Sequence, residues 1–120
     1  MCLLTRQKRP STAKEPIVVY KIFRKENNSF YSPYRNVEKK RVLTENRFSY
    51  DKYVSENLAI NKGIHACLNY NVAKKHANFL DTLCAPWKHC VFKYTIPKGT
   101  KYYKSYNGEE IVALKMVEIK

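Results

Sequence analysis

Ile17-Val18-Val19-Tyr20-Lys21-Ile22-Phe23 is the stretch that decides the fold, because β-branched and aromatic residues follow one another almost without interruption. Residues of these types are enriched in strands, where they pack on a pleated surface. The run is followed by Glu26-Asn27-Asn28-Ser29, whose composition favours a turn. A second run of the same kind, Cys90-Val91-Phe92-Lys93-Tyr94-Thr95-Ile96, predicts a second strand. We therefore expect a protein built around a sheet.

Shorter strands are expected elsewhere in the chain. Gly63 precedes a short apolar run, and Asn107-Gly108 is a dipeptide that favours a type I′ hairpin turn. The candidate short strands are residues 37–43, 64–68, 102–106 and 111–119. Residues 50–61 carry only a weak helical pattern.

A single clear helix is predicted over residues 72–83. Asn71 is the expected N-cap, and Pro86 prevents the helix from continuing. One face of this helix is expected to pack on the sheet. The side chains that recur at helical spacing on that face are Val72, His76, Phe79, Leu80 and Leu83. The side chains expected on the outer side are Lys74, Lys75 and Asn78.

These elements predict one α+β domain, with a mixed or antiparallel sheet of five or six strands and one main helix. A chain of 120 residues with 44% hydrophobic residues has room for one domain and material for a modest core. Residues 1–16 are expected as an extended lead-in, and residues 17–120 as the domain. No apolar run approaches the roughly 18 residues of a membrane span, and no signal-peptide stretch follows the first basic residues. The expected location is therefore the cytoplasm, with no membrane partner.

The charge of the chain is its most distinctive property. Lysine and arginine number 23 against 10 acidic residues, a formal net charge of +13. Self-repulsion on this scale disfavours the compact state, so a polyanionic partner that relieves it is an attractive explanation. Lysine outnumbers arginine, which favours contacts with phosphates over bidentate readout of bases. The alternative is a protein that is basic without any such partner, because net charge by itself reports on solubility and non-specific binding.

Two segments, residues 98–106 and 30–41, combine cations with aromatic rings, as binding to single-stranded nucleic acid requires. The residues predicted to contact nucleic acid are Lys98, Lys101, Tyr102, Lys104 and Tyr106 in one segment, and Lys39, Lys40 and Arg41 in the other. Alternation along a strand would place Tyr102, Lys104 and Tyr106 on one face. The competing interpretation of the first segment is an edge strand protected by lysines, with tyrosines packed beneath it.

The cysteine and histidine pattern does not predict a metal site. Zinc needs four nitrogen or sulfur ligands, usually introduced by closely paired cysteines, and the chain has no such pair. The residues considered were His65, Cys67, Cys84, His89 and Cys90. A Cys–His nucleophile drawn from the same residues is an alternative that no spacing supports. Buried cysteines in a reducing compartment are the preferred interpretation.

Parts of the chain resemble a group of small accessory proteins found in phages and their gut-bacterial hosts. The likeness lies in Met1-Cys2-Leu3-Leu4-Thr5, in Ala13 to Lys21, in Ser32-Pro33-Tyr34 and in Gly63-Ile64-His65-Ala66-Cys67. This resemblance implies an accessory protein of the host cytoplasm. Combined with the charge, it gives the leading prediction: a basic binding module for nucleic acid or a nucleoprotein complex, with no cofactor. A further alternative is an inhibitor that binds a host defence protein, and the oligomeric state is left open.

The order of several motifs is similar to that of ADP-ribosyltransferases. These motifs are Arg24 on the first strand, Gly63 to Leu68, Ile96-Pro97-Lys98-Gly99-Thr100 and Glu109-Glu110-Ile111-Val112. The resemblance implies that Arg24 and His65 hold NAD, that Glu110, or Glu109, is the catalytic carboxylate, and that His65 is the second catalytic residue if the protein is an enzyme. The chain has His65-Ala66-Cys67 in place of the family's Ser-Thr-Ser element, and it lacks Glu-x-Glu spacing. The alternative function is therefore an NAD-binding enzyme of this type or a degenerate relative.

Overall fold

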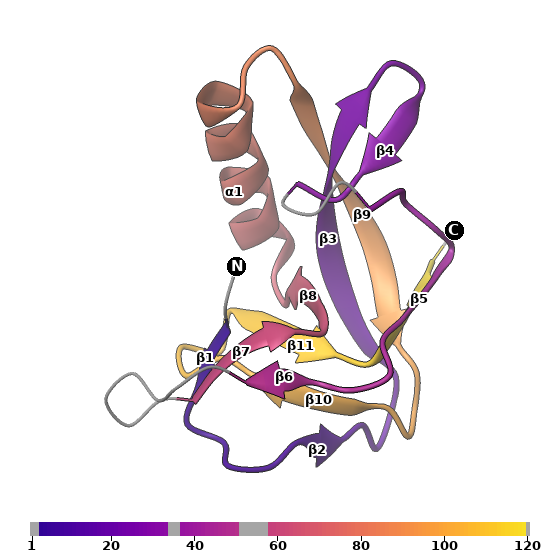
Figure 1. Ribbon diagram of the computed structural model, residues 1–120, viewed down its shortest axis with the longest axis vertical. Helices are drawn as coiled ribbons and strands as arrows, with labels where there is room; N and C mark the ends of the chain where they lie inside the picture. Colours follow the sequence, from indigo (N-terminus) through magenta and orange to yellow (C-terminus); the bar gives the residue numbers. More distant parts are fainter. Residues whose placement is uncertain (1–2, 34–36, 51–57, 120) are drawn as a thin grey trace.

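The computed structural model describes residues 3–33, 37–50 and 58–119, whose arrangement Figure 1 shows. Within these ranges the chain forms one helix and twelve strands, and the strand pairs are antiparallel. The predicted α+β class is confirmed. The predicted number of five or six strands is wrong, because most of the strands have only two to five residues and leave no recognisable run in the sequence.

The centre of the fold is the pair of long strands that the two apolar runs predict. β3 (Ile17–Glu26) and β9 (Lys88–Ile96) pair from Ile17 opposite Ile96 to Lys25 opposite Lys88. Their inward side chains form much of the main core, since Val19, Phe23, Tyr94 and Ile96 are all buried. Burial of such side chains contributes roughly 1.5–3 kcal/mol each, so this pair contributes substantially to stability.

The remaining strands extend this pair on both sides. They are β2 (Ser11–Thr12), β4 (Ser29–Tyr31), β5 (Val42–Thr44), β8 (Ile64–Cys67), β10 (Lys101–Lys104), β11 (Glu110–Ala113) and β12 (Lys115–Glu118). The sheet has the order β2-β10-β11-β8-β3-β9-β12-β5, and β4 also pairs with β3. A smaller sheet has the order β1-β7-β6, from β1 (Leu3–Thr5), β7 (Leu58–Lys62) and β6 (Ser49–Tyr50).

The predicted strand over 111–119 is divided at Leu114. β11 pairs with β8 and β10, whereas β12 pairs with β9 and β5. Two strands that are adjacent in the chain therefore belong to distant places in the strand order, which requires the sheet to curl round its interior. At the break, Leu114 donates its backbone N–H to Lys101 and accepts one from Glu45, so its backbone groups stay paired.

The N-terminal segment, predicted as an extended lead-in, contributes to the fold within residues 3–16. It supplies β1 and β2, and Leu3, Thr5 and Ala13 are buried. The Thr5 hydroxyl donates a hydrogen bond of 2.6 Å to the backbone oxygen of Lys104. Of the stretch 50–61, which has a weak helical pattern, residues 58–61 lie in strand β7, and residues 51–57 are outside the described ranges.

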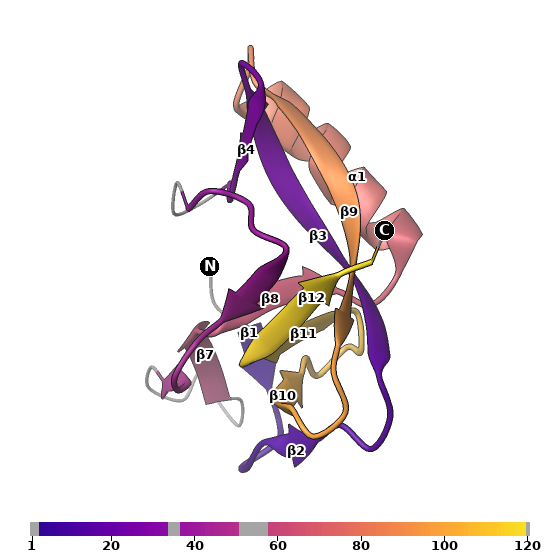
Figure 2. The same ribbon diagram turned by 90° about the vertical axis from the view of Figure 1, so that its right-hand side faces the viewer.

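The predicted helix is α1 (Tyr70–Leu83), and it packs against β9, β3 and β8. Its N-cap is Asn69 and not Asn71, because the Asn69 side chain accepts hydrogen bonds from Asn71 N at 2.7 Å and Val72 N at 3.4 Å. No helix in the described part of the chain is long and apolar enough to cross a membrane. In Figure 2, α1 lies on one side of β3 and β9, and the segment leading into β5 lies on the other.

The inward face of α1 also differs from the prediction. The buried helical residues are Ala73, Ala77 and Leu80. Phe79 and Leu83, expected to face the sheet, are 61% and 66% exposed. The physical reason is that the alanines, which are small, let the helix backbone approach the sheet closely, and this rotates the larger apolar side chains outward.

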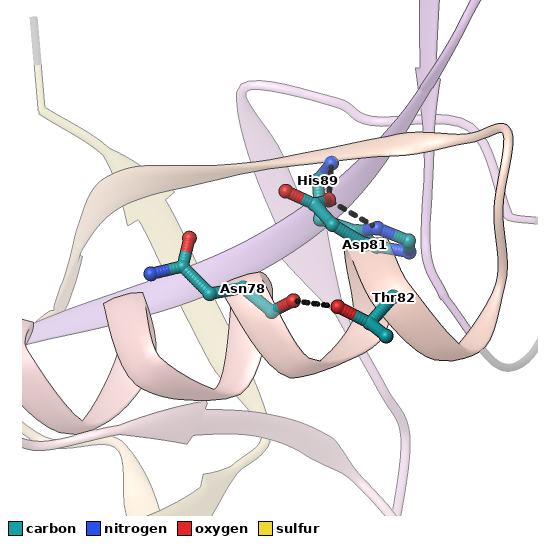
Figure 3. Close-up of polar contacts among 4 residues, drawn as sticks. All are labelled: Asn78, Asp81, Thr82 and His89. Atoms are coloured by element: carbon teal, nitrogen blue, oxygen red, sulfur yellow. Dashed lines mark hydrogen bonds and ion pairs between the residues drawn. The ribbon is translucent and has the colours of Figure 1, made fainter.

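A polar contact joins the end of α1 to the start of β9 (Figure 3). The Asp81 Oδ1 atom accepts the backbone N–H of His89 at 2.6 Å and lies 3.0 Å from Nδ1 of the buried His89 ring. Burial by itself would raise the pKa of Asp81, but the hydrogen bonds from His89 outweigh it and hold the pKa below its usual value. We call this pair the α1–β9 clamp.

Candidate ligand pocket

A pocket of about 300 Å³ opens where β8 leaves β3. These two strands share one register pair, Tyr20 opposite Cys67, and β8 then turns away from β3 (Figure 1). At the other end of β8, Gly63 separates it from β7; its φ of 144° suits glycine, and its missing Cβ leaves room for Val112. The space between the strands is lined from β3, β8, α1 and the segment around β5.

The floor of the pocket contains a lysine that joins the two separating strands. The Lys21 ammonium group donates a hydrogen bond of 2.7 Å to the backbone oxygen of His65. The same nitrogen lies 5.6 Å from the centre of the Phe23 ring. Lys21 therefore places a positive charge beside the pocket while it closes the gap that the divergence of β3 and β8 creates.

Glu110 brings a carboxylate to the pocket from the start of β11. It lies opposite Cys67 in the register between β8 and β11, and its backbone N–H is bonded to the Ser105 hydroxyl at 3.0 Å. Burial raises the pKa of Glu110, a positive charge on His76 acts in the opposite direction, and the neighbouring Glu109 raises it further. The net result is a carboxyl group that accepts protons more readily than an exposed glutamate does.

The thiol of Cys67 is part of the same lining. Burial raises its pKa to about 11, the charge of Glu110 adds to this effect, and Lys21 counteracts it. At neutral pH the thiol is therefore protonated, which makes it a poor nucleophile. The cysteines that the structure describes, Cys67, Cys84 and Cys90, are free thiols. Over the described ranges, no group of three or more His, Cys, Asp and Glu side chains is placed to hold a metal ion.

The outer wall of the pocket is the segment 37–45, which side chains of β9 and β12 hold in place. The Lys39 ammonium forms an ion pair of 2.7 Å with Glu118, and both side chains are less than a fifth exposed. It also lies 4.5 Å from the centre of the Phe92 ring. The Tyr94 hydroxyl donates to the backbone oxygen of Lys40 at 2.8 Å. These contacts hold segment 37–45 against β9 and β12, and several of its residues line the pocket.

The structure brings together some of the residues that the ADP-ribosyltransferase resemblance implies. His65 and Glu110 line the pocket, whereas Glu109 is exposed. Arg24 is not among the described lining residues. Its guanidinium group lies 3.3 Å from a carboxylate oxygen of Glu26 and 5.9 Å from the centre of the Tyr31 ring. The cation that β3 supplies to the pocket is Lys21 instead.

The residues predicted to contact nucleic acid lie on two separate parts of the sheet. Lys98, Lys101 and Lys104 are exposed on or next to β10, as is Tyr106, but Tyr102 is half-buried against the main core. The second segment lies beside β12 and β9: Lys40 and Arg41 are exposed, and Lys39 is engaged by Glu118. The structure therefore does not join the two segments into one surface.

Two pocket residues, Lys21 and His76, are not among the site residues predicted from the sequence. Lys21 is a single cation inside an apolar strand run, which is the signal that could have singled it out. His76 was assigned only to the inward face of the helix. Comparison of the chain with models of protein families, with curated proteins and with solved structures finds no match.

Proposed function

We propose that the pocket binds NAD in the manner of an ADP-ribosyltransferase, enclosing the nicotinamide and its ribose. The supporting observation is that His65 and Glu110, which the resemblance implies and which are 45 positions apart in the sequence, line one pocket. Ligand pockets commonly measure about 300–1,000 Å³. A volume of about 300 Å³ suits a nucleoside-sized group, so the rest of the dinucleotide would extend beyond the pocket.

Each polar group would have a defined task in this complex. The Glu110 carboxylate accepts hydrogen bonds from ribose hydroxyls and stabilises the positive charge that develops on the ribose carbon when its bond to nicotinamide breaks. The bonding electron pair leaves with the nicotinamide nitrogen, and a nucleophile of the acceptor substrate, or water, forms the new bond to the ribose carbon and gives up its proton to solvent. Lys21 supplies a positive charge at the pocket floor, beside the enclosed nicotinamide ribose, where it replaces the cation that the resemblance implies for Arg24. His65 contacts the ligand from β8.

The test is thermal unfolding of the protein with and without NAD. A ligand that binds only the folded state raises the melting temperature, and a concentration of 100 times Kd adds about 2.7 kcal/mol of stability. We expect NAD to raise the melting temperature of the wild-type protein and of the Glu109→Gln variant. It should not raise the melting temperature of Glu110→Gln. Glu109 is the matched control, because it is the adjacent carboxylate and is exposed. The absence of any shift in wild-type protein at millimolar NAD would reject the proposal.

Binding of nucleic acid is the second candidate function. The net charge of +13 favours it, and the exposed lysines at 98, 101 and 104 are one surface on which such binding can be tested. On this proposal the affinity falls steeply with salt, with log K decreasing by about 0.7–0.9 for each phosphate contacted. Which surface would carry such binding is a separate question, because the two predicted segments do not form one face.

A further inference from the structure

The outer face of α1 leaves large apolar side chains in solvent. Phe79, Leu83 and Trp87 are 61%, 66% and 39% exposed. Phe79 and Leu83 are four residues apart and thus neighbours on the helix surface. Trp87 lies in the turn four residues beyond the end of the helix, where its backbone N–H is bonded to the Cys84 oxygen at 3.1 Å. Exposed large apolar side chains gathered at one end of a helix in this way often mark interaction sites in soluble proteins.

Lysines flank these side chains. Lys75 lies one turn before Phe79 on the same side of α1, and Lys88 follows Trp87; both are exposed. Within residues 69–93 the chain has four lysines and one acidic residue, Asp81. The Asp81 carboxylate is engaged by His89 in the α1–β9 clamp. We call the set Lys75, Phe79, Leu83, Trp87 and Lys88 the α1 face; it is apolar, aromatic and positively charged.

We propose that the α1 face binds single-stranded nucleic acid, with Phe79 and Trp87 stacking on unpaired bases and Lys75 and Lys88 contacting phosphates. Single-stranded ligands need exposed rings and cations together, and the α1 face supplies both within a short stretch. A duplex hides the faces of its bases, so the rings would gain nothing from it. A second copy of the chain carries the same charge of +13 and would be repelled.

This surface is distinct from the NAD pocket. His76 and Leu80 line the pocket from α1, and no member of the α1 face is among the described lining residues. Failure of NAD binding would therefore leave this proposal intact, and the reverse also holds. The surface is equally distinct from the lysines of β10, which gives the experiment a matched control.

The experiment uses the single tryptophan of the chain as the reporter. Nuclease-treated protein is titrated with oligo(dT), oligo(rU) and a duplex of equal length, and Trp87 fluorescence is recorded at low and at physiological salt. We expect both single strands to quench Trp87 and the duplex to do so far less. Phe79→Ser removes one stacking ring and is expected to weaken binding by about tenfold. Lys75→Gln should reduce the salt slope by about 0.7.

The controls decide between the possible binding surfaces and occupants. Phe79 is largely exposed, so its replacement by serine should leave the melting temperature nearly unchanged, which confirms that the variant folds. In the double variant Lys101→Gln and Lys104→Gln, single strands should quench Trp87 as they do in wild-type protein. Loss of binding in that variant alone would move the site to β10 and overturn the proposal. The proposal would also be overturned if single strands did not quench Trp87, or if the Phe79→Ser variant bound them as tightly as wild-type protein. A change in Trp87 fluorescence that appears only on raising the protein concentration, or only with anionic vesicles, would overturn it as well.

Discussion

Glu110 is the pocket residue that is expected to reduce the stability of the fold at neutral pH. It is a half-buried carboxyl group next to a second glutamate, and both features favour its protonated form. A group whose pKa is higher in the folded state contributes stability at low pH and loses that contribution as the pH rises through its folded-state pKa. At neutral pH the charged Glu110 therefore lowers the stability of the fold.

This gives a prediction for Glu110→Gln. The variant, which has no charge to bury, is expected to melt at a higher temperature than wild-type protein at pH 7, and the difference should vanish in acid. The measurement is the melting temperature as a function of pH, with Glu109→Gln as the control that changes little. A variant that is less stable at pH 7 would show that the carboxylate is stabilised where it lies. Stability gained together with NAD binding lost is typical of a functional residue.

Asp81 and His89 decide how α1 is joined to the sheet. Asp81→Ala would leave the backbone N–H of buried His89 without its 2.6 Å acceptor, and losing such a bond costs about 1–3 kcal/mol. We expect a lower urea midpoint for this variant at pH 7. Because the pKa of Asp81 lies below its usual value, the stability it contributes is present at neutral pH and is lost as the pH falls through that pKa. The difference from wild-type protein should therefore shrink in strong acid.

Thr82→Ala is the control for this clamp. Thr82 is the next residue of α1 and is exposed, and its hydroxyl makes one long bond of 3.4 Å to the Asn78 oxygen. Its replacement should leave the midpoint almost unchanged. Equal losses from the two variants would mean that the helix end is sensitive to any substitution and that the clamp has no particular role.

At the same scale, the sequence predicted elements well where their apolar runs are long. β3, β9 and most of α1 agree with the prediction, because each has enough apolar residues to show its period. β1, β2, β6 and β7 were missed, because two to five residues carry too little pattern. The inward face of α1 was mistaken because periodicity does not distinguish a large apolar side chain from an alanine that packs more closely.

The candidate site shows a similar limit. His65 and Glu110 were singled out through a family resemblance, and the structure places both at one pocket. Lys21 and His76 were not singled out. Both line the pocket only because β8 leaves β3 after one register pair. Such a divergence is a feature of the tertiary structure, and no local sequence pattern predicts it.

For the whole molecule, the charge of +13 predicts a response to salt. Screening weakens repulsion among the lysines and arginines, so adding sodium chloride is expected to raise the melting temperature. Scanning calorimetry over a salt series measures this effect. A melting temperature that falls with salt would show that the ion pairs, such as Lys39 with Glu118, outweigh the general repulsion.

The break at Leu114 has a consequence for how the chain tolerates insertions and deletions. Glu110, in the pocket lining, and Glu118, which holds the outer wall, lie on either side of it in nearly continuous strand. Side chains alternate between the two faces of a strand, so one added residue reverses every position beyond it. Met116 would turn out of the core, and Glu118 would point away from Lys39. A single inserted codon beside Leu114 would thus break the Lys39–Glu118 ion pair that holds the outer wall, without altering any residue that lines the pocket.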